Sequence, residues 1–186
     1  MDSISFKATT LCKGSVKSFG KTSGSYRNKI VKLVKINSCS EKDYSAMVKL
    51  SKLWEGEDNF IDTILAKLNY SNNHREAPKS DVYILTSQIK NLGNLKPDKI
   101  LGLAEVTAID NTCSLDYLQT RPDSMYSKSE RKYKHVGEYL LNYVTGKFGK
   151  KNLYLRSTEN AIEFYKKYGF IIAQADLNEP LMKYKK

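Results

Sequence analysis

The segment STENAIEFYKKYGF (residues 157–170) carries the clearest structural signal in this sequence. Apolar and aromatic residues recur in it at helical spacing from Thr158 to Tyr168. Gly169 follows at the position where many helices end in the left-handed conformation, which glycine adopts without strain. β-Branched residues after Phe170 then favour a strand. The segment therefore predicts a helix over 158–168, a tight stop and a strand over 170–173.

The same patterns predict further strands and helices towards both ends of the chain. Helices are expected after the capping residues 38–43 and over 60–68, 136–148 and 158–168. Strands are expected over 29–36, 82–86, 100–109, 113–120, 153–155, 170–173 and 181–184. These elements predict a single α/β domain with a mixed, mostly antiparallel sheet of about six to seven strands flanked by about four helices. We expect residues 1–28 to be a basic, Ser-, Gly- and Thr-rich lead-in that is partly flexible, and residues 29–186 to form the domain.

The composition excludes several classes of protein. The 186 residues hold 40% apolar and 27% charged side chains, which is enough apolar surface for a buried core. No stretch approaches the roughly 20 consecutive apolar residues of a membrane span, and the N-terminus has no apolar signal segment. Cys12, Cys39 and Cys113 are scattered, and His74 is far from His135. This pattern argues against a disulfide scaffold and a metal site, and we expect a cytoplasmic protein that binds no metal.

An excess of basic residues gives the chain a formal net charge of +11, from 31 Lys and Arg against 20 Asp and Glu. Such a charge favours anionic partners such as nucleic acid, a phosphorylated cofactor or an acidic protein surface. A lysine-rich surface that only promotes solubility explains the same composition equally well. A Walker-type phosphate loop is not supported, because five residues separate Gly14 from Gly20 and no helix is predicted after Lys21.

Two more motifs lie upstream of the first segment, in the order that one enzyme family shows. The segment 157–170 resembles the S-x-x-x-A-x-x-F-Y-x-x-x-G-F signature of GNAT-type N-acetyltransferases. LQTRP (118–122) is similar to that family's central strand, which splays and ends in a Pro-containing turn. KYKHVGEYLL (132–141) is similar to its R/Q-x-x-G-x-G/A-x-x-L pyrophosphate loop. The resemblance extends from about residue 29 to the C-terminus and implies a GNAT-like fold that transfers an acetyl group from acetyl-CoA directly to a primary amine.

The resemblance also assigns coenzyme A contacts to the open strand end and to the predicted helix start. The cofactor-binding residues that it implies are Leu118, Gln119, Thr120, Arg131, Lys132, Lys134, His135, Val136, Gly137, Glu138, Ser157 and Asn160. A helix N-terminus suits a pyrophosphate because its N–H groups are unpaired and it carries a partial positive charge. The sequence departs from the family where His135 replaces a loop glycine, Lys132 a leading Arg or Gln, and Thr158 a frequent Asn. An ordinary amphipathic helix preceded by basic residues is the structural alternative.

Transfer from a thioester to an amine requires a proton acceptor for the amine and a proton donor for the departing thiolate. The resemblance assigns the donor role to Tyr165, and a phenol keeps its proton at neutral pH. Glu105 is the candidate base, acting directly or through water, and we expect it to share a partly desolvated strand face with Leu101 and Leu103. Asp116 is a weaker candidate for this role. Two alternatives stay open: Tyr165 packs beneath the sheet, and Glu105 is a structural acid.

The acceptor and the partners are less defined by the sequence. Acceptor selection in such folds lies on the early helices and loops, here about 38–80, where no diagnostic motif occurs. The net charge argues mildly against a polyamine and is compatible with a protein N-terminus, an acidic peptide, a small amine or aminoacyl-tRNA. One competing function is a non-catalytic GNAT-like module that binds nucleic acid, because aromatic and basic residues interleave at 126–128 and 133–135. Another is a degenerate enzyme that binds coenzyme A without turnover. We expect a monomer or homodimer that does not bind membranes.

Overall fold

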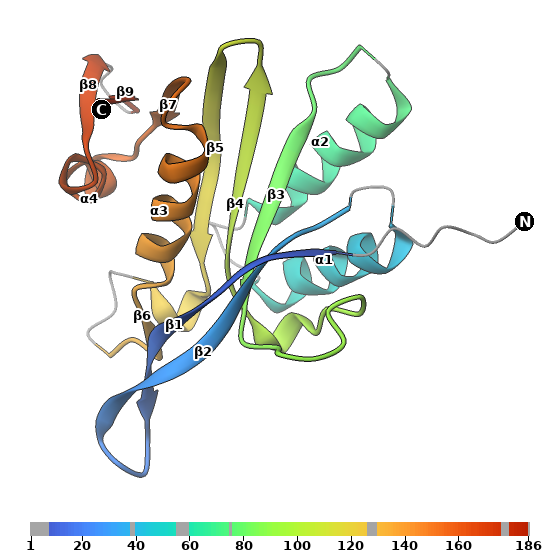
Figure 1. The fold of residues 1–186 in the computed structure, drawn as a ribbon, viewed down its shortest axis with the longest axis vertical. Helices are drawn as coiled ribbons and strands as arrows, with labels where there is room; N and C mark the ends of the chain where they lie inside the picture. The colour runs from blue at the N-terminus through green and yellow to red at the C-terminus, as the bar shows by residue number, and fades with distance from the viewer. Residues whose placement is uncertain are drawn as a thin grey trace, which may run out of the picture.

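A nine-stranded sheet runs through the computed structural model, which describes residues 8–37, 40–54, 60–74, 76–125, 130–175 and 179–185 (Figure 1). The strands are β1 (Thr9–Gly20), β2 (Ser25–Lys35), β3 (Ser80–Thr86), β4 (Ile100–Ile109), β5 (Thr112–Thr120), β6 (Tyr133–Lys134), β7 (Asn152–Arg156), β8 (Phe170–Gln174) and β9 (Leu181–Tyr184). The helices are α1 (Glu41–Leu53), α2 (Ile61–Asn73), α3 (Val136–Phe148) and α4 (Ile162–Lys167).

The strand order is β6-β1-β2-β3-β4-β5-β7-β9-β8, and every neighbouring pair is antiparallel except β5 and β7. The described part of the chain therefore confirms a mixed, mostly antiparallel α/β domain with four α-helices. The expected number of strands was wrong, because the sheet has nine strands and not six to seven.

Helices cover both faces of the sheet, with α3 and α4 on one face and α1 and α2 on the other (Figure 1). On the α3 face, Leu140 and Val144 pack among buried strand residues such as Leu115. On the other face, Leu50 and Ile64 pack against strand residues that include Ile84. Burying an aliphatic side chain of this kind contributes about 1.5–3 kcal/mol, so these two apolar layers hold the sheet between its helices.

The strands β1 and β6 are the ones that the sequence did not predict. Within Thr9–Gly20, Val16 is the only buried side chain, so apolar alternation is absent. Backbone pairing defines β1 instead, because it pairs with β2 from Thr9↔Lys35 to Gly20↔Ser25. The expected boundary at residue 28 falls inside β2, and residues 9–28 belong to the sheet or to the turn within it. Residues 1–7 of the expected lead-in and the aromatic–basic stretch 126–128 lie outside the described residues.

The helix ends differ from the expected ones in two places. α2 continues past residue 68 to Asn73, whose side-chain amide donates a hydrogen bond to the carbonyl of Asn69 at 2.9 Å. The expected helix over 158–168 divides into a 3-10 turn, Glu159–Ala161, and the short helix α4. Gly169 has a φ of +88°, which confirms the left-handed stop.

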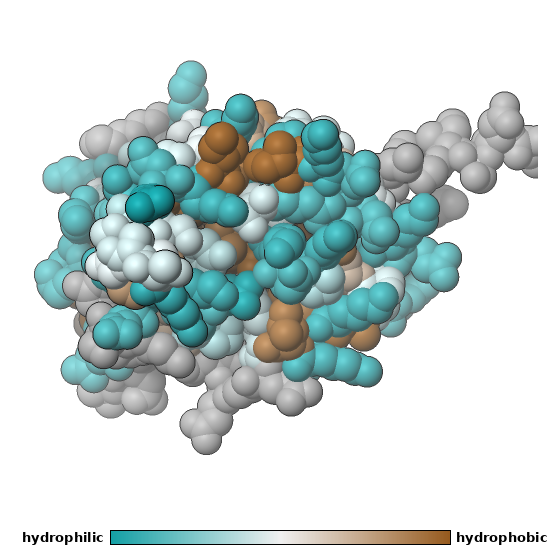
Figure 2. Space-filling model, turned by 90° about the horizontal axis from the view of Figure 1, so that it is seen from below, coloured by the Kyte–Doolittle hydropathy of each residue, from teal (hydrophilic) through white to brown (hydrophobic). Residues whose placement is uncertain are grey.

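The end of the molecule that carries the β1–β2 hairpin, at the bottom of Figure 1, has a mostly hydrophilic surface. Figure 2 views this end and shows apolar side chains in small separate groups among polar ones. None of the helices in the described ranges is long and apolar enough to cross a membrane.

Candidate active site

Strands β5 and β7 run side by side for only part of their length. Their parallel pairing extends from Thr112↔Asn152 to Leu115↔Leu155. β7 ends one residue later, whereas β5 continues through 116–120. In the described chain, this last part of β5 therefore has no strand partner on the β7 side, and we call the parting of the two strands the fork. Backbone groups at the fork can pair with an extended ligand that contains amides.

Helix α3 begins directly beside the fork. A Cβ added to Gly137, in the first turn of α3, would meet Cγ2 of Thr120 at 3.6 Å and Cζ of Phe164 at 3.7 Å. The first N–H groups of a helix have no partner within the helix. The fold therefore brings the end of β5, the first turn of α3 and the α4 segment together.

Gly102 in β4 makes this close approach of α3 possible. A Cβ at that position would lie 2.7 Å from Cγ1 of Val136 and 3.0 Å from Cδ1 of Leu140. Real Cβ atoms essentially never come within 3.0 Å of such an atom, so any larger residue would push the start of α3 away from the sheet. The sequence did not identify Gly102, because a glycine inside a strand pattern does not by itself reveal what approaches it.

His135, the residue before α3, adopts the left-handed conformation with φ +68° and ψ +14°. The family has glycine here, and a side chain in this region costs about 1–2 kcal/mol. Nδ1 of His135 lies 2.8 Å from Oε2 of Glu138, so the ring turns towards the first turn of α3. Burial tends to raise the pKa of Glu138, but the interactions with His135, Tyr168 and Lys167 together lower this pKa overall.

The three basic residues before α3 have different partners. The carbonyl of Arg131 accepts a hydrogen bond from the hydroxyl of Tyr26 at 2.6 Å. The ammonium of Lys132 lies 3.6 Å from Oδ2 of Asp123. The ammonium of Lys134 lies 3.9 Å from the centre of the Tyr26 ring, and is therefore directed at the β1–β2 hairpin.

Tyr165 lies in α4 and is 9% exposed. Its ring contacts the rings of Phe164 and Phe170, with centroid distances of 5.2 and 5.8 Å. Burial raises the pKa of Tyr165 to about 12, so the phenol is protonated at neutral pH. Phe164, its neighbour, is the residue that contacts Gly137. Tyr165 therefore packs in the core and also lies near the start of α3, which fits both roles that the sequence left open.

Ser157 and Asn160 lie in the segment between β7 and α4. Ser157 is buried, and its hydroxyl donates a hydrogen bond to the carbonyl of Thr158 at 2.8 Å. Asn160 lies in the 3-10 turn and is exposed. In β5, Leu118 packs on the α3 side, and the neighbouring Gln119 is buried. These contacts hold the segment in place but do not test the predicted cofactor contacts.

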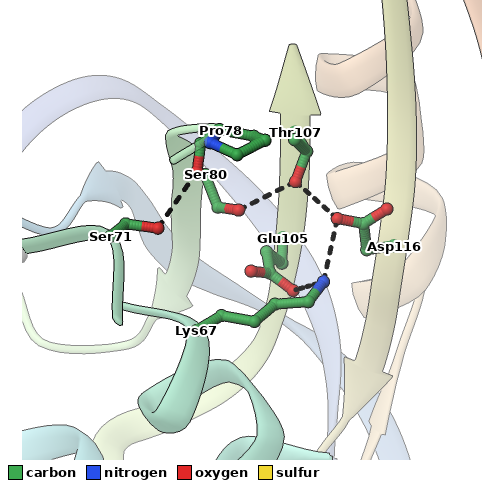
Figure 3. Close-up of polar contacts among 7 residues, drawn as sticks. All are labelled: Lys67, Ser71, Pro78, Ser80, Glu105, Thr107 and Asp116. Atoms are coloured by element: carbon green, nitrogen blue, oxygen red, sulfur yellow. Dashed lines mark hydrogen bonds and ion pairs between the residues drawn. The ribbon is translucent and has the colours of Figure 1, made fainter. Parts of the chain in front are cut away.

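A cluster of polar side chains lies on the α2 face of the sheet, and we call it the Lys67 cluster (Figure 3). The ammonium of Lys67, from α2, lies 3.3 Å from Oε2 of Glu105 and 3.1 Å from Oδ2 of Asp116. The same Asp116 oxygen accepts a hydrogen bond from the Thr107 hydroxyl at 2.5 Å, and Oγ of Ser80 lies 2.8 Å from that hydroxyl. One lysine thus joins a carboxylate from β4 to a carboxylate from β5.

The two carboxylates of the Lys67 cluster have different environments. The Glu105 side chain is fully buried, whereas 18% of the Asp116 side chain is exposed. Burial raises the pKa of Glu105, and the charge of Lys67 offsets part of this effect. Oε1 of Glu105 has no hydrogen-bond partner within the described residues. Burial that raises the pKa of a carboxylate also makes it a better proton acceptor, which is the property that a general base needs.

A β-bulge places Asp116 in this cluster. In the pairing of β4 with β5, Glu105 lies opposite Tyr117 and Val106 lies opposite Leu115, so Asp116 is the extra residue. Asp116 is also the first residue of β5 beyond its pairing with β7. The Lys67 cluster therefore lies at the fork on the α2 face, while Tyr165 lies on the α3 face.

A second bulge corrects one expectation about Glu105. Leu103 packs on the α2 face, as expected for a face shared with Glu105, but Leu101 packs on the α3 face. The cause is an irregularity in the pairing of β3 with β4, where Leu85 lies opposite Gly102 and Thr86 lies opposite Ile100. This extra residue reverses the alternation between Leu101 and Leu103.

Sequence reasoning missed Ser80, Thr107 and the central residue of this cluster, Lys67. Its position in α2 predicts only an ordinary charged side chain, because the partners lie far along the chain in β4 and β5. Asp116 was considered as a weaker base, and the structure joins it to Glu105 through Lys67. The one available signal was that Lys67 lies beside the apolar stripe of Ile64 and Leu68, on the side of α2 that faces the sheet.

Comparisons with known proteins give information on the fold. No protein-family model matches the sequence, and no curated protein matches it. The PaiA N-acetyltransferase of Thermoplasma acidophilum, solved in complex with coenzyme A, is 16% identical, with a TM-score of 0.52 over 84% of this chain and 99% of that one. The N-acetyltransferase PseH of Campylobacter jejuni is 15% identical, with a TM-score of 0.51 over 84% and 98%. A Desulfovibrio desulfuricans protein described as a GNAT-family acetyltransferase is 15% identical, with a TM-score of 0.53 over 81% and 96%.

These matches confirm the expected GNAT-like fold. The chain spans nearly the whole length of each matched protein, so the similarity covers the complete fold and not a fragment of it. At identities of 15–16%, the similarity shows the fold alone.

Proposed function

We propose that the protein is an N-acetyltransferase that transfers an acetyl group from acetyl-CoA directly to a primary amine. The observation that supports this most strongly is the position of the first turn of α3 at the fork, where Gly137 lies beside Thr120. The fork offers strand backbone groups, and the helix start offers N–H groups with a partial positive charge. The GNAT fold makes this assignment the first one to test.

The residues at the fork fit coenzyme A in their chemistry. Gly137 leaves the start of α3 without a side chain, so its backbone can approach a pyrophosphate closely. Backbone groups of 116–120 would pair with the amides of the pantetheine arm. Arg131 and Lys132 supply positive charge before the helix, and Nδ1 of His135 lies 2.8 Å from the Glu138 carboxylate. When bound, acetyl-CoA supplies an acetyl group that is already activated as a thioester.

Tyr165 is the proposed proton donor. Its hydroxyl oxygen holds a proton throughout the neutral range, because burial raises the pKa to about 12. The proton donor must lie near the sulfur of the departing coenzyme A thiolate. Tyr165 lies on the α3 face of the sheet, and the start of α3 would hold the cofactor on this face. Its surroundings of Phe164 and Phe170 keep water away from the phenol.

Glu105 is the proposed proton acceptor, and Lys67 positions it. Because Glu105 is fully buried, a proton from the amine reaches it through an ordered water or through the more exposed Asp116. With all three groups ionised the Lys67 cluster carries a net charge of about −1, which attracts a cationic amine to the fork. The acceptor class that follows is a primary amine on a small molecule or on a protein.

The first test is thermal unfolding with and without acetyl-CoA. A ligand at about 100 times its Kd stabilises the folded protein by about 2.7 kcal/mol, which raises Tm by several degrees for a domain of this size. We expect this shift with acetyl-CoA and none with ATP at the same concentration. The absence of any shift at millimolar acetyl-CoA would contradict the proposal.

A second test identifies the base. Release of free thiol is measured with a panel of amines that includes a peptide with a free N-terminus. We expect Glu105→Gln to lower kcat about 100-fold or more while the stabilisation by acetyl-CoA is retained. Asp116→Asn serves as the comparison, with a smaller loss of kcat. The reverse ranking would make Asp116 the base and Glu105 its structural neighbour.

A further inference from the structure

Strands β1, β2 and β6 form an extension of the sheet that carries only positive charge, and we call it the ribbon. β1 and β2 contain no Asp or Glu, and neither does β6. Between Thr9 and Lys35 there are seven cations: Lys13, Lys17, Lys21, Arg27, Lys29, Lys32 and Lys35. In a chain with 20 acidic residues, a run of this length without one is a local excess and not a reflection of the overall composition.

The two faces of the ribbon have different surroundings. Gly14 and Val16 face α3, because a Cβ on Gly14 would meet the ring of Tyr139 and because Val16 is buried in the α3-side core. Side chains alternate along a strand, so Lys13 and Lys17 lie on the opposite face. The register adds neighbours from the other two strands: Lys32 lies opposite Lys13, and Lys134 lies opposite Lys17.

None of the helices in the described ranges covers this second face at the hairpin (Figure 1). Lys13 and Lys17 are exposed, and Ile30 is 50% exposed. The rings of Phe19 and Tyr26 lie on the same face nearer the tip, with centroids 5.2 Å apart. The face therefore presents Lys13 and Lys17 to solvent, with Lys32, Lys134, Phe19 and Tyr26 half-buried beside them.

The lysines of this face have no compensating acids. Within the described residues, none of Lys13, Lys17, Lys32 and Lys134 forms an ion pair with a carboxylate; Lys32 donates to a backbone carbonyl, and Lys134 lies over a tyrosine ring. Lys17 and Lys134 are directly opposite each other on neighbouring strands. Like charges in that position destabilise a sheet, and a bound anion would remove the repulsion.

We propose that this face of the ribbon binds the phosphate backbone of a nucleic acid. Lys13 and Lys17 are four residues apart, which places them about 13 Å from each other along the strand, so they can contact different phosphates of one chain. Phe19 and Tyr26 add rings of the kind on which bases stack. An anionic membrane fits less well, because Ile30, at 50%, is the one exposed large apolar side chain in the described hairpin.

This surface is separate from the proposed cofactor site. The cofactor would bind at the α3 side of the sheet, and the lysine row lies on the other face, to which Lys134 also turns. Nucleic-acid binding, which the sequence left open as an alternative function, can therefore accompany acetyl transfer. The simplest competing explanation is that these lysines keep β1 from pairing with strands of other chains. The outer edge of β1 pairs with β6 only at Lys17 and Ser18, so most of this edge is open.

Fluorescence anisotropy distinguishes these explanations. The probes are a labelled oligouridine RNA of about 20 nucleotides and an RNA duplex of the same length, titrated between about 50 and 200 mM salt. The variant is Lys13→Gln/Lys17→Gln, in which both residues are exposed. The matched control is Lys42→Gln/Lys49→Gln in α1, which makes the same change in net charge at two other exposed lysines.

The proposal predicts saturable binding whose dependence on salt becomes less steep in the β1 variant. The slope of log K against log salt should fall by about 1.4 for the single strand or about 1.8 for the duplex, and the α1 variant should keep the wild-type slope. If the ligand is single-stranded, Phe19→Leu should lower its affinity about fivefold without a change in slope.

Three outcomes would overturn the proposal: no saturable binding of either RNA, an equal loss in the α1 control, or tighter binding to phosphatidylserine vesicles than to RNA. Stabilisation by acetyl-CoA is measured on the same variants and should equal that of the wild type. A failure of RNA binding is therefore distinguishable from a failure of the proposed enzymatic function.

Discussion

The ammonium of Lys67 lies 3.3 Å from Oε2 of Glu105, a carboxylate whose side chain is fully buried in the sheet. Lys67 itself is 40% exposed, so this ion pair joins the interior to the solvent. Burial raises the pKa of Glu105. Burial alone would lower the pKa of Lys67, but Glu105 and Asp116 more than reverse this effect, so the pKa of Lys67 is raised overall. The ion pair therefore offsets part of the rise in the pKa of Glu105 that burial causes.

Lys67→Met should destabilise the protein by an amount that grows with pH. A Glu with a raised pKa in the folded state keeps its proton longer there than in the unfolded chain, so stability falls as pH rises above the usual value of 4.5. Removing Lys67 raises that pKa further. We expect the free energy of unfolding to fall by about 1–3 kcal/mol at neutral pH, which is less than for a fully buried pair because Lys67 is partly exposed. Below pH 4.5 the loss should be smaller.

Urea denaturation at several pH values measures this effect. The control is the same substitution in a Glu105→Gln background, where no buried charge is left without a partner and the pH dependence should shrink. An equal loss of stability at every pH, in both backgrounds, would mean that Lys67 contributes through packing and not through Glu105.

Tyr165→Phe should separate catalysis from cofactor binding. The substitution removes one hydroxyl and keeps the ring that packs on Phe164 and Phe170, so stability should change by less than about 1 kcal/mol. Loss of a general acid should lower kcat about 100-fold, while acetyl-CoA still raises Tm as in the wild type. Unchanged turnover in steady-state assays would assign Tyr165 to the core alone. Because its pKa is about 12, ionisation of Tyr165 should cause no loss of wild-type activity below about pH 11.

The predictable part of the fold is the part whose elements have an apolar pattern. The helix α3 and the strands β3 to β5 bury one or both faces, and their sequences show it. β1 was missed because it is held by backbone pairing along its length and buries only Val16. The two-residue strand β6 was missed because it exists only through its pairing with Lys17 and Ser18 of β1. A strand without apolar alternation becomes visible only when its partner is known.

The candidate site was predictable where it depends on local motifs. Gly137 and Tyr165 belong to short motifs, and the structure places their segments side by side. The Lys67 cluster depends instead on two β-bulges and on a contact between α2 and distant strands, which no local pattern records. The direction of Lys134 was equally hidden, because it depends on Tyr26 in a hairpin that the sequence did not predict.

Gly102→Ala should displace the start of α3. The new Cβ would lie 2.7 Å from Cγ1 of Val136, and the helix must shift to make room for it. We expect a destabilisation of about 1–3 kcal/mol, measured by urea denaturation, together with weaker stabilisation by acetyl-CoA. Gly146→Ala is the matched control. This glycine lies inside α3, and a Cβ added to it would meet nothing within 4 Å. This substitution should stabilise the protein by about 0.5–1 kcal/mol, and equal effects of the two substitutions would contradict the steric argument.

Gly137→Ala should weaken cofactor binding without damaging the fold. The added Cβ would meet Thr120 and Phe164 only at 3.6 and 3.7 Å, which is ordinary van der Waals contact, and alanine is the better helix former. The methyl group would nevertheless occupy the space through which a pyrophosphate approaches the first N–H groups of α3. Isothermal titration should therefore show an acetyl-CoA affinity about tenfold lower or worse, which corresponds to about 1.4 kcal/mol, while the free protein keeps its Tm or gains slightly. Unchanged affinity would move the pyrophosphate away from the start of α3, and with it the central argument for a cofactor at the fork.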